Sequence, residues 1–107
     1  GAAIGDTLKS LKGIAITDAN NTNGKWQYSF GANVWIDVGA VTPGAALLLK
    51  DVSKLRFVPN SGYVGPATIS YKAWDQTAGQ AGDRIDTTGA LNSFSVAIET
   101  ATINVTA

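Results

Sequence analysis

Residues 25–38, which read KWQYSFGANVWIDV, show the clearest alternation of apolar and polar side chains in the chain. The apolar side chains fall on the even positions, first Trp26, Tyr28 and Phe30 and then Val34, Ile36 and Val38. Because side chains alternate between the two faces of a β-strand, each half predicts a strand with one buried face. Gly31, Ala32 and Asn33 separate the halves, so the segment predicts a β-hairpin.

Alternation or short apolar runs predict further strands on both sides of this hairpin, at residues 13–17, 47–49, 55–58, 68–73 and 94–105. In the last of these, the apolar residues shift from even positions up to Ile98 to odd positions from Ala101. This shift predicts a β-bulge near Glu99 or Thr100 that turns both halves of one long strand toward the same core. Residues 1–12 carry apolar side chains at helical spacing and predict at most a short helical turn.

The composition agrees with a chain built from strands. Val, Ile and Thr together number 27 against 7 Leu, and β-branched residues favour strands. Turns rich in Gly, Pro and Asn separate about seven short segments. We therefore predict a single all-β domain over residues 1–107, an antiparallel β-sandwich of immunoglobulin-like type, with a closed barrel as the structural alternative.

Charge and residue content exclude several classes of function. The formal net charge is zero and only 15% of residues are charged, which argues against nucleic acid as a partner because phosphate binding requires clustered Lys and Arg. The chain has neither His nor Cys, so a Cys/His zinc site, a disulfide framework and a His or Cys catalyst are excluded. No apolar run is long enough to span a bilayer, so we expect no membrane insertion.

Several spaced motifs resemble the cadherin-like, immunoglobulin-fold repeats of large bacterial surface and secreted proteins. They are residues 13–17 (GIAIT), 21–29 (NTNGKWQYS), Trp35, 55–60 (LRFVPN), Tyr63, Gly65 and 69–77 (ISYKAWDQT). The resemblance covers most of the chain, from about Leu11 to the end. It implies a secreted or cell-surface module that acts in adhesion or as a structural spacer. Its implied partners are neighbouring repeats of the same chain, a glycan or another cell-surface component.

The resemblance also implies calcium as a cofactor. Asp75 is the best ligand candidate because it follows a predicted strand, and Asp18 is the second. Asp83 and Asp86 lie in the same loop as Asp75 and complete the candidate set. Calcium requires six to eight oxygen ligands at about 2.3–2.6 Å, which such a loop can supply. The alternative is that these carboxylates cap turns through local backbone hydrogen bonds.

Two departures from the repeat pattern bear on these expectations. Such repeats usually have an extra strand before the segment that corresponds to Gly1, and an Asp- or Asn-containing linker after the segment that corresponds to Ala107. Residues 1–107 carry neither feature, which places calcium between neighbouring repeats in doubt. An unpaired sheet edge is expected where the first strand is missing.

Trp35 and Trp74 are candidates for ligand binding by a second class of module, a carbohydrate-binding module of a secreted hydrolase. Such modules need exposed aromatic rings on which sugars stack. Trp26 shares its face with two other aromatic residues, which favours the core for its side chain, whereas Trp35 and Trp74 fall on the opposite faces of their strands. Partial burial under loops is the alternative for both.

We expect no catalytic activity. Glu99 is the only Glu, whereas a glycosidase needs two carboxylates across a cleft, one of them with a raised pKa. The candidate Asp residues lack an apolar neighbourhood that would tune their pKa. No Ser stands three residues before a Lys, the spacing of a Ser–Lys catalytic pair.

Overall fold

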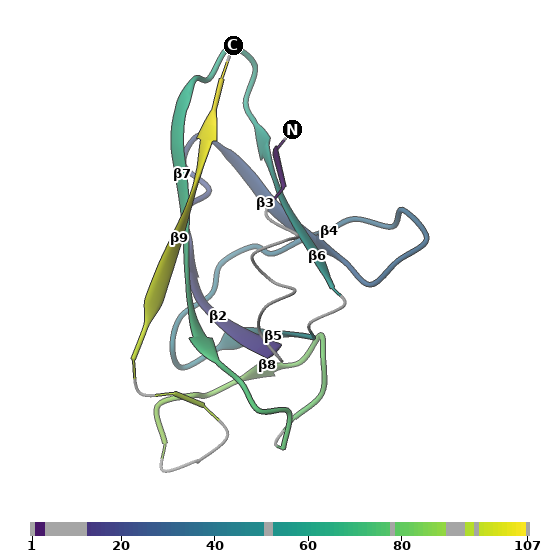
Figure 1. Cartoon of the computed structure of the whole chain (residues 1–107), viewed down its shortest axis with the longest axis vertical. Helices are drawn as coiled ribbons and strands as arrows, with labels where there is room; N and C mark the ends of the chain where they lie inside the picture. Colours follow the sequence, from purple (N-terminus) through teal and green to yellow (C-terminus); the bar gives the residue numbers. More distant parts are fainter. Residues whose placement is uncertain are drawn as a thin grey trace.

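A computed structural model describes residues 2–3, 13–50, 53–77, 79–89, 94–95 and 97–106. These residues form two antiparallel sheets, ordered β1-β6-β3-β4 and β8-β5-β2-β7-β9, which confirms the predicted all-β antiparallel sandwich (Figure 1). The strands are β1 (Ala2–Ala3), β2 (Gly13–Ala19), β3 (Gly24–Ser29), β4 (Ile36–Asp37), β5 (Ala46–Lys50), β6 (Lys54–Pro59), β7 (Gly65–Ala73), β8 (Arg84–Ile85) and β9 (Glu99–Val105). The described residues contain no helix. The predicted helical turn lies outside them, except for the two residues of β1.

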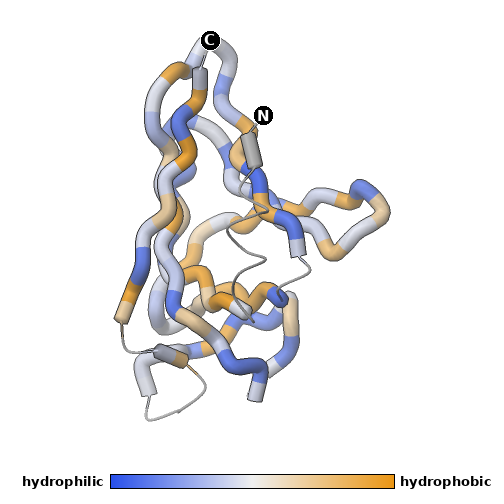
Figure 2. The backbone as a smooth tube through the Cα atoms, viewed as in Figure 1, coloured by the Kyte–Doolittle hydropathy of each residue, from blue (hydrophilic) through white to orange (hydrophobic). Residues whose placement is uncertain are grey.

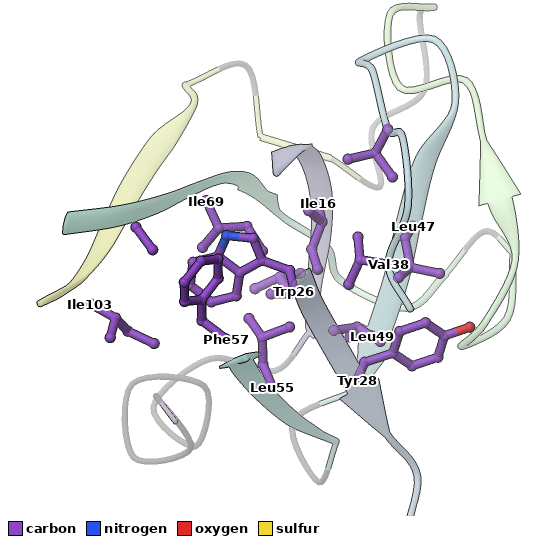
Figure 3. Packing of buried hydrophobic residues seen from close by; sticks show 13 residues of the cluster. Ile16, Trp26, Tyr28, Val38, Leu47, Leu49, Leu55, Phe57, Ile69 and Ile103 are labelled. Atoms are coloured by element: carbon purple, nitrogen blue, oxygen red, sulfur yellow. The ribbon is translucent and has the colours of Figure 1, made fainter. Parts of the chain in front are cut away.

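The main core lies between the two sheets (Figure 3). The rings of Trp26 and Phe57, which come from neighbouring strands β3 and β6, pack with centroids 5.3 Å apart at an angle of 58°. From the opposite sheet, Ile16, Leu49 and Ile69 contribute buried side chains to the same cluster. The strands predicted at residues 13–17, 47–49, 55–58 and 68–73 are all confirmed within β2, β5, β6 and β7.

A β-bulge occurs in β2, between Ile16 and Asp18. Strict alternation from Ile14 would turn Asp18 toward the core. Because the bulge adds one residue to the strand, Asp18 is exposed instead and Ala19 packs against the core.

The C-terminal segment differs from its prediction. Strand β9 begins at Glu99 and pairs with β7 without a shift of register, so the bulge predicted near Glu99 or Thr100 is wrong. Phe94 does not belong to β9 but forms an isolated bridge with Trp74, and Ile98 is exposed. The two halves of the predicted strand therefore pack in different places: Ile103 lies in the main core, whereas Phe94 lies in a second apolar cluster.

A second, smaller cluster covers the outer face of the five-stranded sheet. Ala15, Ala46 and Leu48 point outward from β2 and β5, and Trp74 and Phe94 pack on them. The sheet is thus apolar on both faces in this region, which explains the uninterrupted buried runs of β2 and β5.

The hairpin of β3 and β4 is confirmed, with Tyr28 opposite Ile36 and Gln27 opposite Asp37. Its predicted buried face is only partly correct. Trp26, Tyr28 and Val38 are buried, but Phe30, Val34 and Ile36 are 50%, 57% and 42% exposed. The segment between β3 and β4 projects from the body of the sandwich, at the right in Figure 1, so these side chains lack an opposing sheet. No helix of the described residues is long and apolar enough to cross a membrane.

Candidate functional site

The outer face of the four-stranded sheet carries a row of connected polar side chains. Lys25 and Gln27 alternate with the buried residues of β3 and point outward. Pairing places Arg56 of β6 and Asp37 of β4 on either side of Gln27. Because directly opposite residues share a face of a sheet, the side chains of all three meet there.

Hydrogen bonds fix these side chains in one arrangement. The Nε and Nη2 atoms of Arg56 both donate to Oε1 of Gln27, at 2.9 and 2.7 Å. Nε2 of Gln27 donates to Oδ1 of Asp37 at 2.8 Å, and Nζ of Lys25 lies 3.8 Å from Oδ2 of the same carboxylate. The exposed ion pair contributes little stability, but the row as a whole presents ordered donors and acceptors to solvent.

Trp35 lies at one end of this row. The guanidinium carbon of Arg56 is 4.0 Å from the centroid of the Trp35 ring, a cation–π contact. Trp35 is half-buried, and the guanidinium occupies one face of its ring. A ligand that stacks on Trp35 would therefore have to use the opposite face of the ring.

At the other end of the row, Lys25 and Asp37 line a depression of about 550 Å³. Asn21, Gly39 and Asn60 also contribute to its walls. Asn21 is held in place by its own bonds, since its Oδ1 accepts from the backbone N–H of Trp26 at 2.8 Å and its Nδ2 donates to the carbonyl of Gly39 at 3.2 Å. The volume falls within the range of small-molecule sites.

The projecting hairpin adds an apolar surface beside the row. We call Phe30, Val34 and Ile36 the hairpin tip; they are three of the six exposed large hydrophobic side chains of the described residues. The tip closes with a β-turn in which the N–H of Val34 donates to the carbonyl of Gly31 at 3.2 Å. Figure 2 shows apolar residues along both sides of this arm.

Trp74 does not offer a stacking face. Its side chain is only 2% exposed and belongs to the cluster on the outer face of the five-stranded sheet. Its backbone N–H donates to the carbonyl of Gly13 at 3.0 Å, which fixes it against β2. Of the two Trp residues predicted as ligand candidates, Trp35 alone remains accessible.

Three of the four candidate calcium ligands cap turns. Oδ1 of Asp75 accepts from the backbone N–H and the hydroxyl of Thr77, at 2.9 and 2.6 Å. Oδ2 of Asp83 accepts from the N–H of Gln80 at 3.0 Å. These are the local turn contacts that the capping alternative describes.

Asp86 caps its turn in the same way. Its Oδ1 accepts from the N–H of Thr88 at 2.8 Å and from its hydroxyl at 2.5 Å. These two bonds lower the pKa of the Asp86 carboxyl, and the charge of Lys72 adds to the effect.

The four carboxylates do not converge on one site. Asp18 lies opposite Ser70 of β7 in the sheet. Asp75 comes five residues after Ser70, just beyond the end of β7. At about 3.4 Å per residue of extended chain, roughly 17 Å of backbone separates Ser70, the residue opposite Asp18, from Asp75. Among the described residues, no three acidic side chains come close enough to hold a metal ion together.

Sequence reasoning missed Arg56, Gln27, Asp37 and Lys25 as members of one surface. Alternation did place Lys25 and Gln27 on one face of their strand, which was the available signal. The pairing of β3 with β6 joins residues 29 positions apart, and nothing in the local sequence specifies that register. No protein-family model, curated protein or solved structure matches this chain.

Proposed function

We propose that this chain is a non-catalytic β-sandwich module that binds a partner outside the cell, as an adhesive segment of a large bacterial surface or secreted protein. The observation that carries the proposal is the hairpin tip. Three exposed large apolar side chains lie within residues 30–36, which comprise the projecting segment between β3 and β4 and the first residue of β4 (Figure 1). Clustered exposed apolar side chains on a soluble domain mark interaction sites.

The strand order gives partial support to the immunoglobulin-like likeness. Strands β2 and β5 pair in one sheet while β3 and β6 pair in the other, the same relation as the B–E and C–F pairs of the immunoglobulin fold. Strand β7 departs from that order because it pairs with β2 rather than with β6.

The position of the chain ends favours adhesion over a spacer role. Strand β1 contacts β9, and both ends of the chain lie at the same end of the sandwich, at the top of Figure 1. An end-to-end stalk needs the chain to enter at one end of a module and leave at the other. Within a longer protein, this module would project sideways and present its hairpin.

Attachment of coated beads tests the adhesive proposal. Beads that carry the module are scored for attachment to protein-coated and polysaccharide-coated surfaces. The double substitution Phe30→Ser and Ile36→Ser should abolish attachment, because it removes the apolar contact surface. Val64→Ser, which alters an equally exposed apolar residue outside the hairpin, should leave attachment unchanged. Equal attachment by all three proteins would refute a role for the hairpin tip.

The second candidate is a carbohydrate-binding module of a secreted hydrolase. It is favoured by Trp35, whose ring lies beside the ordered amide, carboxylate and guanidinium groups of the row on β3, β4 and β6. Sugar recognition combines such polar groups with aromatic stacking. The depression beside Lys25 and Asp37 is large enough for a saccharide unit.

Titration with soluble oligosaccharides, followed by intrinsic Trp fluorescence, tests the second candidate. Trp35→Ala should weaken binding at least about tenfold, since aromatic anchors dominate such contacts. Val64→Ala, at an exposed residue outside β3, β4 and β6, is the matched control. Binding that persists in Trp35→Ala would exclude this surface as the sugar site.

Calcium stiffening, which the family resemblance implies, stays a prediction. Melting temperatures in EDTA and in excess calcium test it, because an ion that binds only the folded state raises the melting temperature. Asp75→Ala should abolish any such rise. Equal melting temperatures in the two solutions would remove calcium from the proposal.

A further inference from the structure

Strand β9 is an edge strand of the five-stranded sheet, and it contacts β1 of the opposite sheet. In the described part of the chain the sheets end at β1, β4, β8 and β9. The first three are two residues long, whereas β9 spans seven, Glu99–Val105. Proteins protect exposed edges with short strands, charges, prolines or bulges, since free backbone groups invite pairing with another chain.

None of these protective features interrupts β9. Its only charged residue is Glu99, at its first position, and it contains no Pro. Its pairing with β7 is regular from Gly65 opposite Val105 to Tyr71 opposite Glu99. Figure 1 shows β9 crossing β7 at the left of the molecule, and β9 is the last strand in the order of its sheet.

The side chains of β9 continue both faces of the sheet up to this edge. Ile103 is buried in the main core, and Ala101 and Val105 are partly buried against it. On the other face, Thr100, Thr102 and Asn104 are exposed. An added strand with the same alternation would extend the core on one face of the sheet. On the other face it would continue the exposed polar side chains of β9.

We propose that two copies of this chain associate by antiparallel pairing of β9 with β9 about a twofold axis at Thr102. This register places Thr102 opposite Thr102 and Thr100 opposite Asn104 on the polar face. On the core face it places Ala101 opposite Ile103. Apolar residues therefore meet apolar residues, and Glu99 faces Val105 rather than another charge.

The chemistry of this contact already occurs within one copy. Across the β7–β9 pair, the hydroxyl groups of Ser70 and Thr100 are 3.0 Å apart and hydrogen-bonded. The Thr102 pair at the twofold axis would repeat this hydroxyl contact on the free side of β9. The match of the strand to itself favours a second copy over an unrelated extended peptide, because a twofold contact must be self-complementary.

The dimer would carry one hairpin at each of its two outer ends. The hairpin projects at the right of Figure 1, away from β9 at the left. Pairing through β9 therefore leaves both hairpin tips free. The inference does not depend on the proposed function, but two tips on one particle would increase the avidity of adhesion.

Sedimentation equilibrium of the whole chain over a range of concentrations tests the proposal. We expect the wild-type chain to sediment as a dimer at the higher concentrations. Thr102→Lys should give a monomer, because it places two like charges directly opposite each other at the twofold axis. Thr22→Lys, the same change in an exposed turn, is the matched control and should remain dimeric.

A mixing experiment tests the register itself. Thr102→Glu alone should also be monomeric, and it serves as the second variant should Thr102→Lys fail to fold. An equimolar mixture of the Lys and Glu variants should recover the dimer, since opposite charges then meet at the axis. A wild-type chain that stays monomeric at every soluble concentration overturns the proposal. A dimer that survives Thr102→Lys, or a mixture that fails to recover it, overturns it as well.

Discussion

Gly24 occupies a position in β3 where no side chain fits. A Cβ atom there would lie 2.4 Å from the carbonyl oxygen of Val58 and 2.8 Å from Cα of Pro59. Both atoms belong to the backbone of the neighbouring strand β6 and cannot move without disturbing the pairing of the two strands. The sequence places this Gly after Asn23, where it is expected in a turn, yet its packing role becomes visible only once β6 lies beside it.

We predict that Gly24→Ala destabilises the fold by about 2–3 kcal/mol, at the upper part of the usual range for overpacking. Urea denaturation measures the change in the free energy of unfolding. Gly44→Ala is the matched control, because the nearest atom to its Cβ is Oγ1 of Thr42 at 3.8 Å, an ordinary contact. Equal effects of the two substitutions would show that the close approach of β6 is not what excludes a side chain.

The Asp86 carboxylate gives a prediction about pH. Its folded-state pKa is lowered by the two bonds from Thr88, so its contribution to stability is present above the ordinary carboxyl pKa. This contribution is lost as the pH falls through the lowered value. Thr88→Val removes the hydroxyl bond, so the pKa of Asp86 should rise toward its ordinary value, measured by NMR titration of the side-chain carboxyl carbon. Thr77→Val, at the equivalent Asp75 cap, should leave it unchanged.

The β3–β4 hairpin is the element whose backbone is held in the least favourable conformation. Ala32 and Asn33, the central residues of its turn, have φ values of 56° and 54°. Two consecutive positive φ angles with a hydrogen bond from Val34 to Gly31 describe a type I′ turn. That turn prefers Asn-Gly, and Ala in the left-handed region costs about 1–2 kcal/mol.

We predict that the double substitution Ala32→Asn and Asn33→Gly stabilises the module by about 1 kcal/mol. Denaturant unfolding is again the measurement. The variant keeps every side chain of the hairpin tip, so bead attachment should persist. Ala40→Gly, at an exposed position without a positive φ, should instead be neutral or slightly destabilising. A loss of stability in the double variant would contradict the turn assignment.

At the level of elements, periodicity identified the long strands and failed at their ends. Alternation in β3 continues to Phe30, but the strand ends at Ser29, because no opposing sheet covers residues beyond it. In the same way, the phase shift near Glu99 reflects a change of cluster between Phe94 and Ile103 rather than a bulge. The alternation of apolar residues along a strand does not indicate which other segment, if any, will pack on its apolar face.

At the scale of the whole molecule, stability depends on two apolar clusters on opposite faces of one sheet. Trp74 is the largest side chain of the smaller cluster. Its backbone bonds to Gly13 of β2 and forms a bridge with Phe94. We predict that Trp74→Ala costs about 3–5 kcal/mol in the free energy of unfolding, as for other buried aromatic residues. This is a large share of the roughly 5–15 kcal/mol typical of a domain.

Trp35→Ala serves as the control for this prediction. Trp35 is half-buried on an outer face, so its removal should destabilise the protein far less. Unfolding in guanidinium chloride distinguishes the two. Similar losses for both variants would indicate that the smaller cluster adds little to the stability of the whole fold.

The candidate site could be predicted only in part from the sequence. Trp35 and Asp37 both alternate with the apolar residues of their segment, which predicts that their side chains point outward. That outer face does carry the row of polar side chains. The sequence does not link Arg56 to this face, because the residues meet only through the pairing of β3 with β6. Trp74 also falls on the outward face of its strand, but it packs against Phe94, about twenty residues further along the chain. Local alternation does not specify that contact.

Because the two ends of the chain lie close together, this sandwich is suitable for circular permutation and for insertion into another protein. Since β1 contacts β9, a linker that joins the two ends closes the backbone into a ring without crossing the sandwich. New termini can then be opened at the exposed turn around Ser61 and Gly62, as circular permutation generally tolerates. For the same reason, a host protein can accept the entire fold as an insert in one of its surface loops.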